Sequence, residues 1–78
     1  PTTRIDFDVA HTTHVRIRIY NLLGQEVRTL QNSIMETGRH FVIWDGKDAH
    51  DRAVASGVYL YRLEAGAVTK VKKMLLLK

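Results

Sequence analysis

The residues best suited to chemistry in this chain are three carboxylates and an imidazole within one short polar stretch. The stretch reads Asp45-Gly46-Lys47-Asp48-Ala49-His50-Asp51. Oxygen ligands at short spacing suit calcium, but their order here differs from that of an EF-hand loop, and neighbouring basic side chains compete for the carboxylates. Asp and Gly also form turns, because Asx side chains bond the local backbone. We interpret the stretch as a structural turn in which Asp45 caps loop amides, with calcium binding by Asp45, Asp48 and Asp51 as the alternative.

The other side chains that could do chemistry are scattered along the chain. The four histidines are His11, His14, His40 and His50. No pair of them has the spacing of a zinc site on one strand face. Ser33 and Ser56 lack the glycine pattern of a nucleophile elbow, and no glycine-rich phosphate loop is present. We therefore predict a protein that is not an enzyme, with no catalytic residue, no metal site and no cofactor.

Size and charge limit the remaining functions. A chain of 78 residues is one small domain, which removes only about 60% of its unfolded surface from water. The absence of cysteine excludes disulfides and thiolate metal sites. The net charge is +4, and much of the excess is terminal, since Lys70, Lys72, Lys73 and Lys78 follow Glu64 with no further acid. A basic terminal strand is typical of a solvated or edge-protecting face, so we expect no nucleic-acid partner.

The chain shows no signal peptide and no membrane span. Its longest apolar run, Met74 to Leu77, has four residues. Because the chain begins at Pro1 without methionine, we expect it to be a single domain, residues 1–78, cut from a longer protein.

Polar and apolar residues alternate through most of the chain, which predicts β-strands. The expected strands before the acidic loop cover residues 4–9, 14–20, 26–30 and 38–44. Asn21 and Gly24 suit a hairpin turn between the second and third strands. Residues 31–37 lose the period and are expected to bridge two sheets. Trp44, the only tryptophan, is expected at the centre of the core.

The strand after the acidic loop organises the rest of the chain. It reads Gly57-Val58-Tyr59-Leu60-Tyr61-Arg62-Leu63, and both its faces are largely apolar, which favours a position in the middle of a sheet. Residues 68–77 form the last strand, whose apolar residues change parity, so we expect a bulge near Lys72-Lys73. Six or seven short strands without a helical period indicate an all-β protein, an Ig-like antiparallel β-sandwich.

With these residues in view, the chain resembles the C-terminal sorting domains (type A) of the type IX secretion system of Bacteroidetes, which are related to the Ig-like domain of the flagellar hook-capping protein. The segments that carry the resemblance are Pro1-Thr2-Thr3-Arg4-Ile5, Val15-Arg16-Ile17-Arg18-Ile19-Tyr20-Asn21-Leu22-Leu23-Gly24, Gly38-Arg39-His40, Trp44-Asp45-Gly46-Lys47-Asp48, Ala55-Ser56-Gly57-Val58-Tyr59-Leu60-Tyr61-Arg62-Leu63 and Lys73-Met74-Leu75-Leu76-Leu77-Lys78. The chain departs from the pattern at Asp51-Arg52-Ala53, where relatives commonly have glycine.

The resemblance implies a secretion signal that directs its parent protein through the periplasm to the cell surface. Its partners would be the outer-membrane secretion machinery and a sortase-like peptidase. The residues expected to form the recognition signal are Gly57, Tyr59, Lys73, Met74, Leu75, Leu76, Leu77 and Lys78. Strand addition at exposed sheet edges would provide the contacts.

Two other functions compete with export. The first is an architectural Ig-like module, a spacer or hook-cap piece that associates with copies of itself through sheet edges. The second is a small ligand-binding appendage such as a carbohydrate module, which would use Trp44, Tyr20 and Tyr61.

Overall fold

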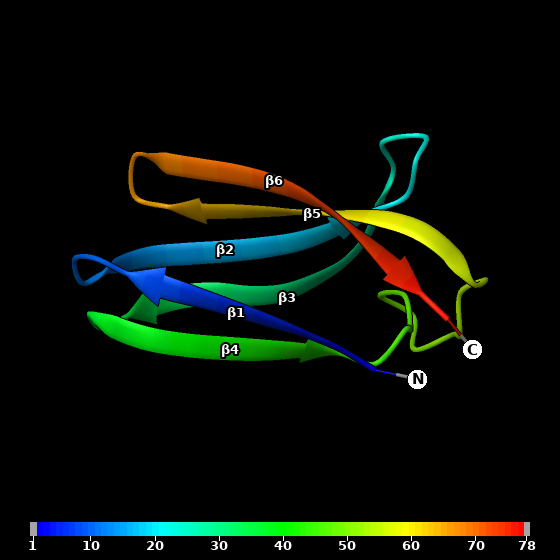
Figure 1. Cartoon of the computed structure of the whole chain (residues 1–78), viewed down its shortest axis with the longest axis horizontal. Coiled ribbons are helices and arrows are strands. Elements are labelled where there is room, and N and C mark those ends of the chain that lie inside the picture. Colours follow the sequence, from blue (N-terminus) through cyan, green and yellow to red (C-terminus); the bar gives the residue numbers. More distant parts are fainter. Residues whose placement is uncertain (1, 78) are drawn as a thin grey trace.

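The computed structural model describes residues 2–77 as two antiparallel β-sheets packed face to face (Figure 1). The smaller sheet pairs β1 (Thr3–Val9) with β4 (Gly38–Trp44). The larger sheet has the order β3-β2-β5-β6, with bounds β2 Thr13–Tyr20, β3 Glu26–Met35, β5 Gly57–Ala65 and β6 Val68–Leu76. The all-β antiparallel sandwich predicted from the sequence is therefore confirmed, with six strands in the described residues. In these residues there is no helix that is long and apolar enough to cross a bilayer.

The core lies between the sheets and is built by the period-two patterns. On β2, the inward side chains Val15, Ile17 and Ile19 are fully buried. Trp44, at the end of β4, has no exposed surface, which confirms its predicted central position. The other buried hydrophobic residues are Ile5, Phe7, Val9, Tyr59, Leu63 and Leu76. Burial of these apolar side chains is the main favourable contribution to folding.

β5 occupies the predicted central position, between β2 and β6. Its inward residues Tyr59 and Leu63 are buried, whereas Val58 and Leu60 on the other face are only partly covered. The strand is therefore covered by the smaller sheet on one face and keeps the other toward solvent.

β3 is longer than predicted. Residues 31–35, expected in the bridge between the sheets, continue the strand to Met35, so that only Glu36 and Thr37 connect it to β4. The alternation is lost because the register with β2 shifts twice, between Ile17 and Arg18 and between Ile19 and Tyr20. Each bulge adds an unpaired residue and changes the parity of the strand beyond it.

The bulge predicted in the last strand is absent, and that prediction is wrong. The β5–β6 register runs without a shift from Gly57↔Leu76 to Ala65↔Val68. Met74 and Leu76 therefore share the inner row of β6 with Lys70 and Lys72. The apolar residues of the sequence change parity because charged side chains occupy part of the inner row, and the strand itself has no bulge.

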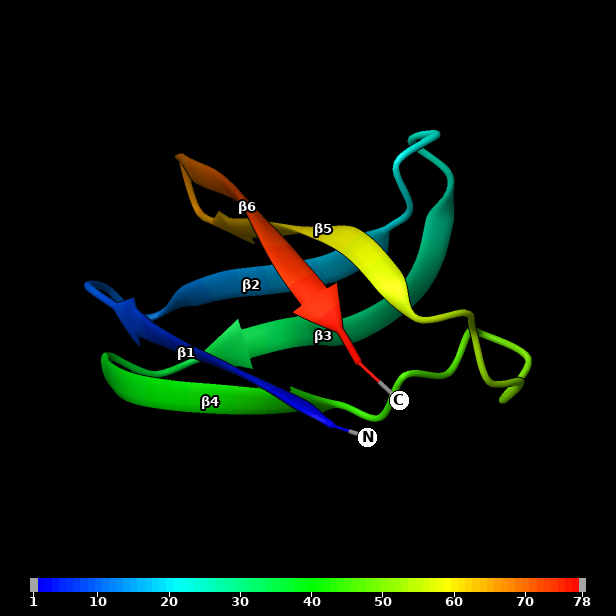
Figure 2. The same ribbon diagram turned by 45° about the vertical axis from the view of Figure 1, so that its right-hand side comes forward.

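The sandwich is closed on one side and open on the other. On the closed side, the two-residue connection between β3 and β4 joins the sheets. On the other side lie β1 and β6, which are edge strands of different sheets. Figures 1 and 2 show these two strands converging near the chain ends and separating toward the turns at residues 10–12 and 66–67. The open side therefore has the outline of a wedge.

Candidate functional site

The acidic loop uses its carboxylates to hold its own backbone. Asp45 Oδ1 accepts a hydrogen bond from the Lys47 amide at 3.1 Å, which confirms the predicted capping role. Asp48 Oδ1 accepts from the amides of His50 at 2.9 Å and Arg52 at 3.0 Å. The hydrogen bond from the Arg52 amide, aided by that from His50, lowers the pKa of Asp48 against the opposing effect of desolvation. Asp51 lies 3.8 Å from Lys47 Nζ.

The same loop is bound to the rest of the fold. Trp44 Nε1 donates to the carbonyl of Lys47 at 2.9 Å. The Ala49 amide donates to the carbonyl of Val27 on β3, also at 2.9 Å. Arg28 Nη1 donates to the carbonyl of Asp48 at 3.2 Å. In residues 2–77, no group of three or more His, Cys, Asp or Glu side chains is arranged to hold a metal ion. The loop is a structural turn of the kind expected from its Asx and Gly residues.

His40 and Ser33, two of the scattered polar side chains, make structural contacts. His40 stacks on Phe7 with ring centroids 5.7 Å apart, and its Nε2 lies 2.8 Å from the carbonyl of Glu36. Ser33 Oγ accepts a hydrogen bond from Gln31 Nε2 at 2.6 Å. Both side chains are thus held by contacts within their own parts of the sandwich.

The outer face of the larger sheet carries an ionic network around Glu64. Arg16 donates to both carboxylate oxygens of Glu64, with Nη2 at 3.0 Å and 3.2 Å, and Arg18 Nη2 donates to Oε1 at 2.8 Å. Partial desolvation acts to raise the pKa of Glu64, but the hydrogen bonds from Arg16 and Arg18 outweigh it, so the pKa is lowered. The Arg18 guanidinium also lies 5.6 Å from the ring centroid of Tyr20. The charged side chains on this face of the larger sheet therefore pair with one another.

The residues predicted as a recognition signal divide between the core and the surface. Tyr59 and Leu76 are buried, and Gly57 has a φ of 153°, a backbone conformation that favours glycine. Met74 is partly buried. The exposed ones are Lys73, Leu75 and Leu77. Lys78 lies outside the described residues. The structure thus places the described members on β5, on β6 and directly after β6, and it exposes only part of them.

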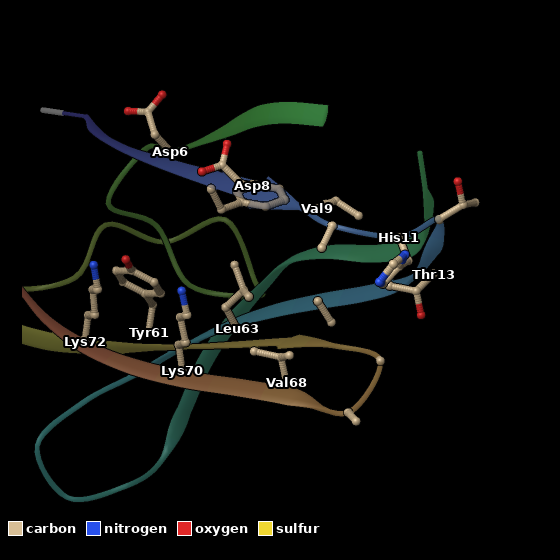
Figure 3. A pocket seen from close by; sticks show the side chains of 16 residues that line it. Asp6, Asp8, Val9, His11, Thr13, Tyr61, Leu63, Val68, Lys70 and Lys72 are labelled. Atoms are coloured by element: carbon tan, nitrogen blue, oxygen red, sulfur yellow. The ribbon is translucent and has the colours of Figure 1, made fainter. Parts of the chain in front are cut away.

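Sequence reasoning missed a groove along the open side of the sandwich. Its volume is about 710 Å³, and it lies between β1 and the adjoining turn on one side and β5 and β6 on the other (Figure 3). Phe7, Val9, Leu63 and Val68 provide its apolar lining. Burial raises the pKa of Tyr61, which also lines it. The signal that could have revealed the groove is the placement of Lys70 and Lys72 in an otherwise inward-facing row.

Comparisons with known proteins identify relatives of this sandwich. The family model described as FlgD Ig-like domain matches residues 2–68. Among solved structures, FlgD from P. aeruginosa superposes with a TM-score of 0.77 at 19% sequence identity, covering 97% of this chain. This chain spans 61% of the length of that FlgD chain. A search of the curated proteins gave no match.

The comparisons separate the two halves of the resemblance seen in the sequence. The relation to the Ig-like domain of the hook-capping protein is confirmed, whereas the type IX sorting domain gains no support from them. The match is to an Ig-like domain and not to an enzyme family. Because the family model covers most of the sequence, this chain belongs to the FlgD Ig-like domain family.

Proposed function

We propose that this chain is a non-catalytic assembly module, which holds protein subunits together by associating with copies of itself. The family match over residues 2–68 is the observation that carries the proposal. The local contacts agree with it, because the acidic loop and the Glu64 network are occupied by structural bonds. What the domain offers to a partner is sheet surface.

The surface best suited to self-association is the outer face of the smaller sheet. Phe41 and Ile43 on β4 are each 52% exposed there. The Arg4 guanidinium lies 4.0 Å from the centroid of the Phe41 ring, and Arg4 also pairs with Asp6 at 3.1 Å. An apolar patch rimmed by charged groups is typical of a protein interface.

Sedimentation equilibrium of the chain over a range of concentrations tests this function. We expect reversible association by the wild type and its loss in the double variant Phe41→Ser, Ile43→Ser. Val71→Ser is the matched control, because Val71 is 59% exposed on β6 of the other sheet. A wild-type chain that stays monomeric at every concentration, or a double variant that associates as well as the wild type, would contradict the proposal.

The second candidate is the export signal, and the exposed part of β6 favours it. Lys73, Leu75 and Leu77 share the outer row of this edge segment, with Leu75 56% and Leu77 69% exposed. In this case the partners are the outer-membrane secretion machinery and a sortase-like peptidase, and a longer parent protein passes through the periplasm to the cell surface. The chain fused to a secreted reporter is then expected to reach the surface of a type IX host. Removal of residues 73–78 is expected to leave the reporter in the periplasm, and unchanged export would exclude this function.

A further inference from the structure

The groove on the open side is bordered by two strands that each have a free edge. β6 pairs with β5 alone and β1 pairs with β4 alone within the described chain. Each therefore presents a row of backbone N–H and C=O groups without a ladder partner. Between these edges lie the apolar side chains of Phe7, Val9 and Leu63, with Val68 at the rim and 52% exposed.

The dimensions of the groove suit an extended peptide. Its β6 wall runs from Val68 to Lys72, which at about 3.3 Å per residue is about 13 Å. That length corresponds to a strand of about five residues, the usual length in globular proteins. An added strand in this position would extend the larger sheet beyond β6 and cover the apolar lining.

Two lysines give the β6 wall its charge. The side chains of Lys70 and Lys72 rise from β6 toward β1, while the carboxylates of Asp6 and Asp8 lie on the far side of β1 (Figure 3). Both lysines are exposed, and neither forms an ion pair or hydrogen bond with another residue in the range 2–77. Within the described residues their ammonium groups are therefore available to carboxylates of an incoming strand.

The same lysines disfavour the simplest competing occupant, the β6 edge of a second copy. Pairing two β6 strands would bring like charges opposite one another, which destabilises a sheet. Inward-pointing charges on an edge strand are a known protection against such pairing. The β6 edge thus disfavours a basic strand as a pairing partner and favours an acidic one.

We propose that this groove binds an extended, acidic segment of another protein, which adds to the larger sheet beside β6. One apolar side chain of the segment lies opposite Val68, and carboxylates lie opposite Lys70 and Lys72. Main-chain hydrogen bonds supply the affinity of such strand addition, and alternate side chains supply its specificity. The proposal goes beyond self-association, because the occupant is a different chain and the surface is not the outer face of β4.

A synthetic peptide tests the proposal on the intact chain. The probe is a peptide of about seven residues with blocked termini. Its alternate residues are Glu, Glu and Val on one strand face and Thr on the other. The peptide is made with this sequence and with the reversed sequence, so that it can pair with β6 in either direction. Amide chemical shifts of the ¹⁵N-labelled chain are followed during titration, at concentrations at which the chain alone is monomeric. We expect shift changes concentrated on β1, β5 and β6, and about fivefold tighter binding than for the same peptide with Lys in place of Glu.

Charge-reversal variants test whether Lys70 and Lys72 cause the preference for the acidic peptide. The double variant Lys70→Glu, Lys72→Glu is expected to reverse the preference, so that the Lys peptide binds more tightly. Lys70→Gln with Lys72→Gln is expected to abolish the preference and serves if the reversed variant does not fold. Lys73→Glu is the matched control, because Lys73 lies on the opposite face of the same strand and should leave the preference intact.

Three outcomes would overturn the proposal. They are shift changes confined to other edges, equal binding of the acidic and basic peptides, and occupation of the groove by a second copy that the acidic peptide cannot displace. Loss of self-association in the sedimentation experiment affects none of these measurements, so the two proposals fail separately.

Discussion

The ring of Tyr59 meets the ring of Trp44 edge-on, with centroids 5.0 Å apart and planes inclined by 70°. This contact joins β5 of the larger sheet to β4 of the smaller one at the fully buried tryptophan. The Tyr59 hydroxyl also donates to the carbonyl of Ala55 at 2.6 Å, which fixes the segment that precedes β5. The Tyr59 side chain thus connects the two sheets and the segment before β5.

Removing the Tyr59 hydroxyl should cost less stability than removing the ring. We expect Tyr59→Phe to lower the free energy of unfolding by about 1 kcal/mol, because the hydrogen bond to Ala55 is lost. Tyr59→Ala should cost about 3–5 kcal/mol, because the ring no longer fills its place against Trp44. Urea unfolding monitored by tryptophan fluorescence measures both values. Equal losses for the two variants would show that the ring contact contributes nothing beyond the hydroxyl.

The β2–β3 turn depends on one asparagine. Asn21 Oδ1 accepts from the amides of Leu23 at 2.9 Å and Gln25 at 3.0 Å. We expect Asn21→Ala to cost about 1 kcal/mol, because these two amides lose their side-chain acceptor. Leu23→Ala is the control and should stay within about 0.5 kcal/mol, since Leu23 is 84% exposed. Thermal unfolding distinguishes them, and indistinguishable midpoints would contradict the prediction.

Because the pKa of Glu64 is lowered in the folded state, the free energy of unfolding depends on pH. The carboxylate is favoured in the folded state, so its contribution is present above the ordinary pKa of 4.5 and is lost as the pH falls through the lower folded pKa. We therefore expect the free energy of unfolding to fall as the pH drops below about 5. Glu64→Gln should reduce the slope in this window. Urea titrations at stepped pH measure it, and an unchanged slope in the variant would rule out this contribution.

Asp51 has a φ of 63°, which places a non-glycine residue in the left-handed region. Asp tolerates this conformation, but a β-branched side chain does not. We expect Asp51→Val to cost about 1–2 kcal/mol and Asp51→Gly to stay within about 0.5 kcal/mol of the wild type. Differential scanning calorimetry compares the two. A valine variant as stable as the glycine variant would show that the loop relaxes around the new residue.

The strands that the sequence predicts best are those with one buried face. β1 and β2 keep strict alternation because Ile5 and Phe7, like Ile17 and Ile19, all meet the core. β3 lacks this regularity, since two bulges opposite β2 change its parity. Bulges depend on pairing with another strand, so a local pattern does not locate them.

The candidate sites show a similar division. The capping role of Asp45 follows from local chemistry, because an Asx side chain binds an amide two residues away. The groove depends on which strands are left as edges, and that is a property of the whole topology. In the sequence, Lys70 and Lys72 only interrupt the alternation of apolar residues. Their place along the groove follows only once β6 is known to be the last strand of its sheet.

The pairing of β1 with β4 has a consequence for the order of folding. The β2–β3 and β5–β6 pairs are hairpins that close over short turns, whereas β1 must find a partner across nearly half of the chain. Hairpins form within about 1–10 μs, and pairings between distant segments are slower because more chain entropy is lost on closure. We therefore expect the smaller sheet, like the β2–β5 pairing that joins Val15 to Ala65, to form after these two hairpins. In native-state hydrogen exchange, the amides of β1 should exchange earlier than those of β2, which is held on both sides.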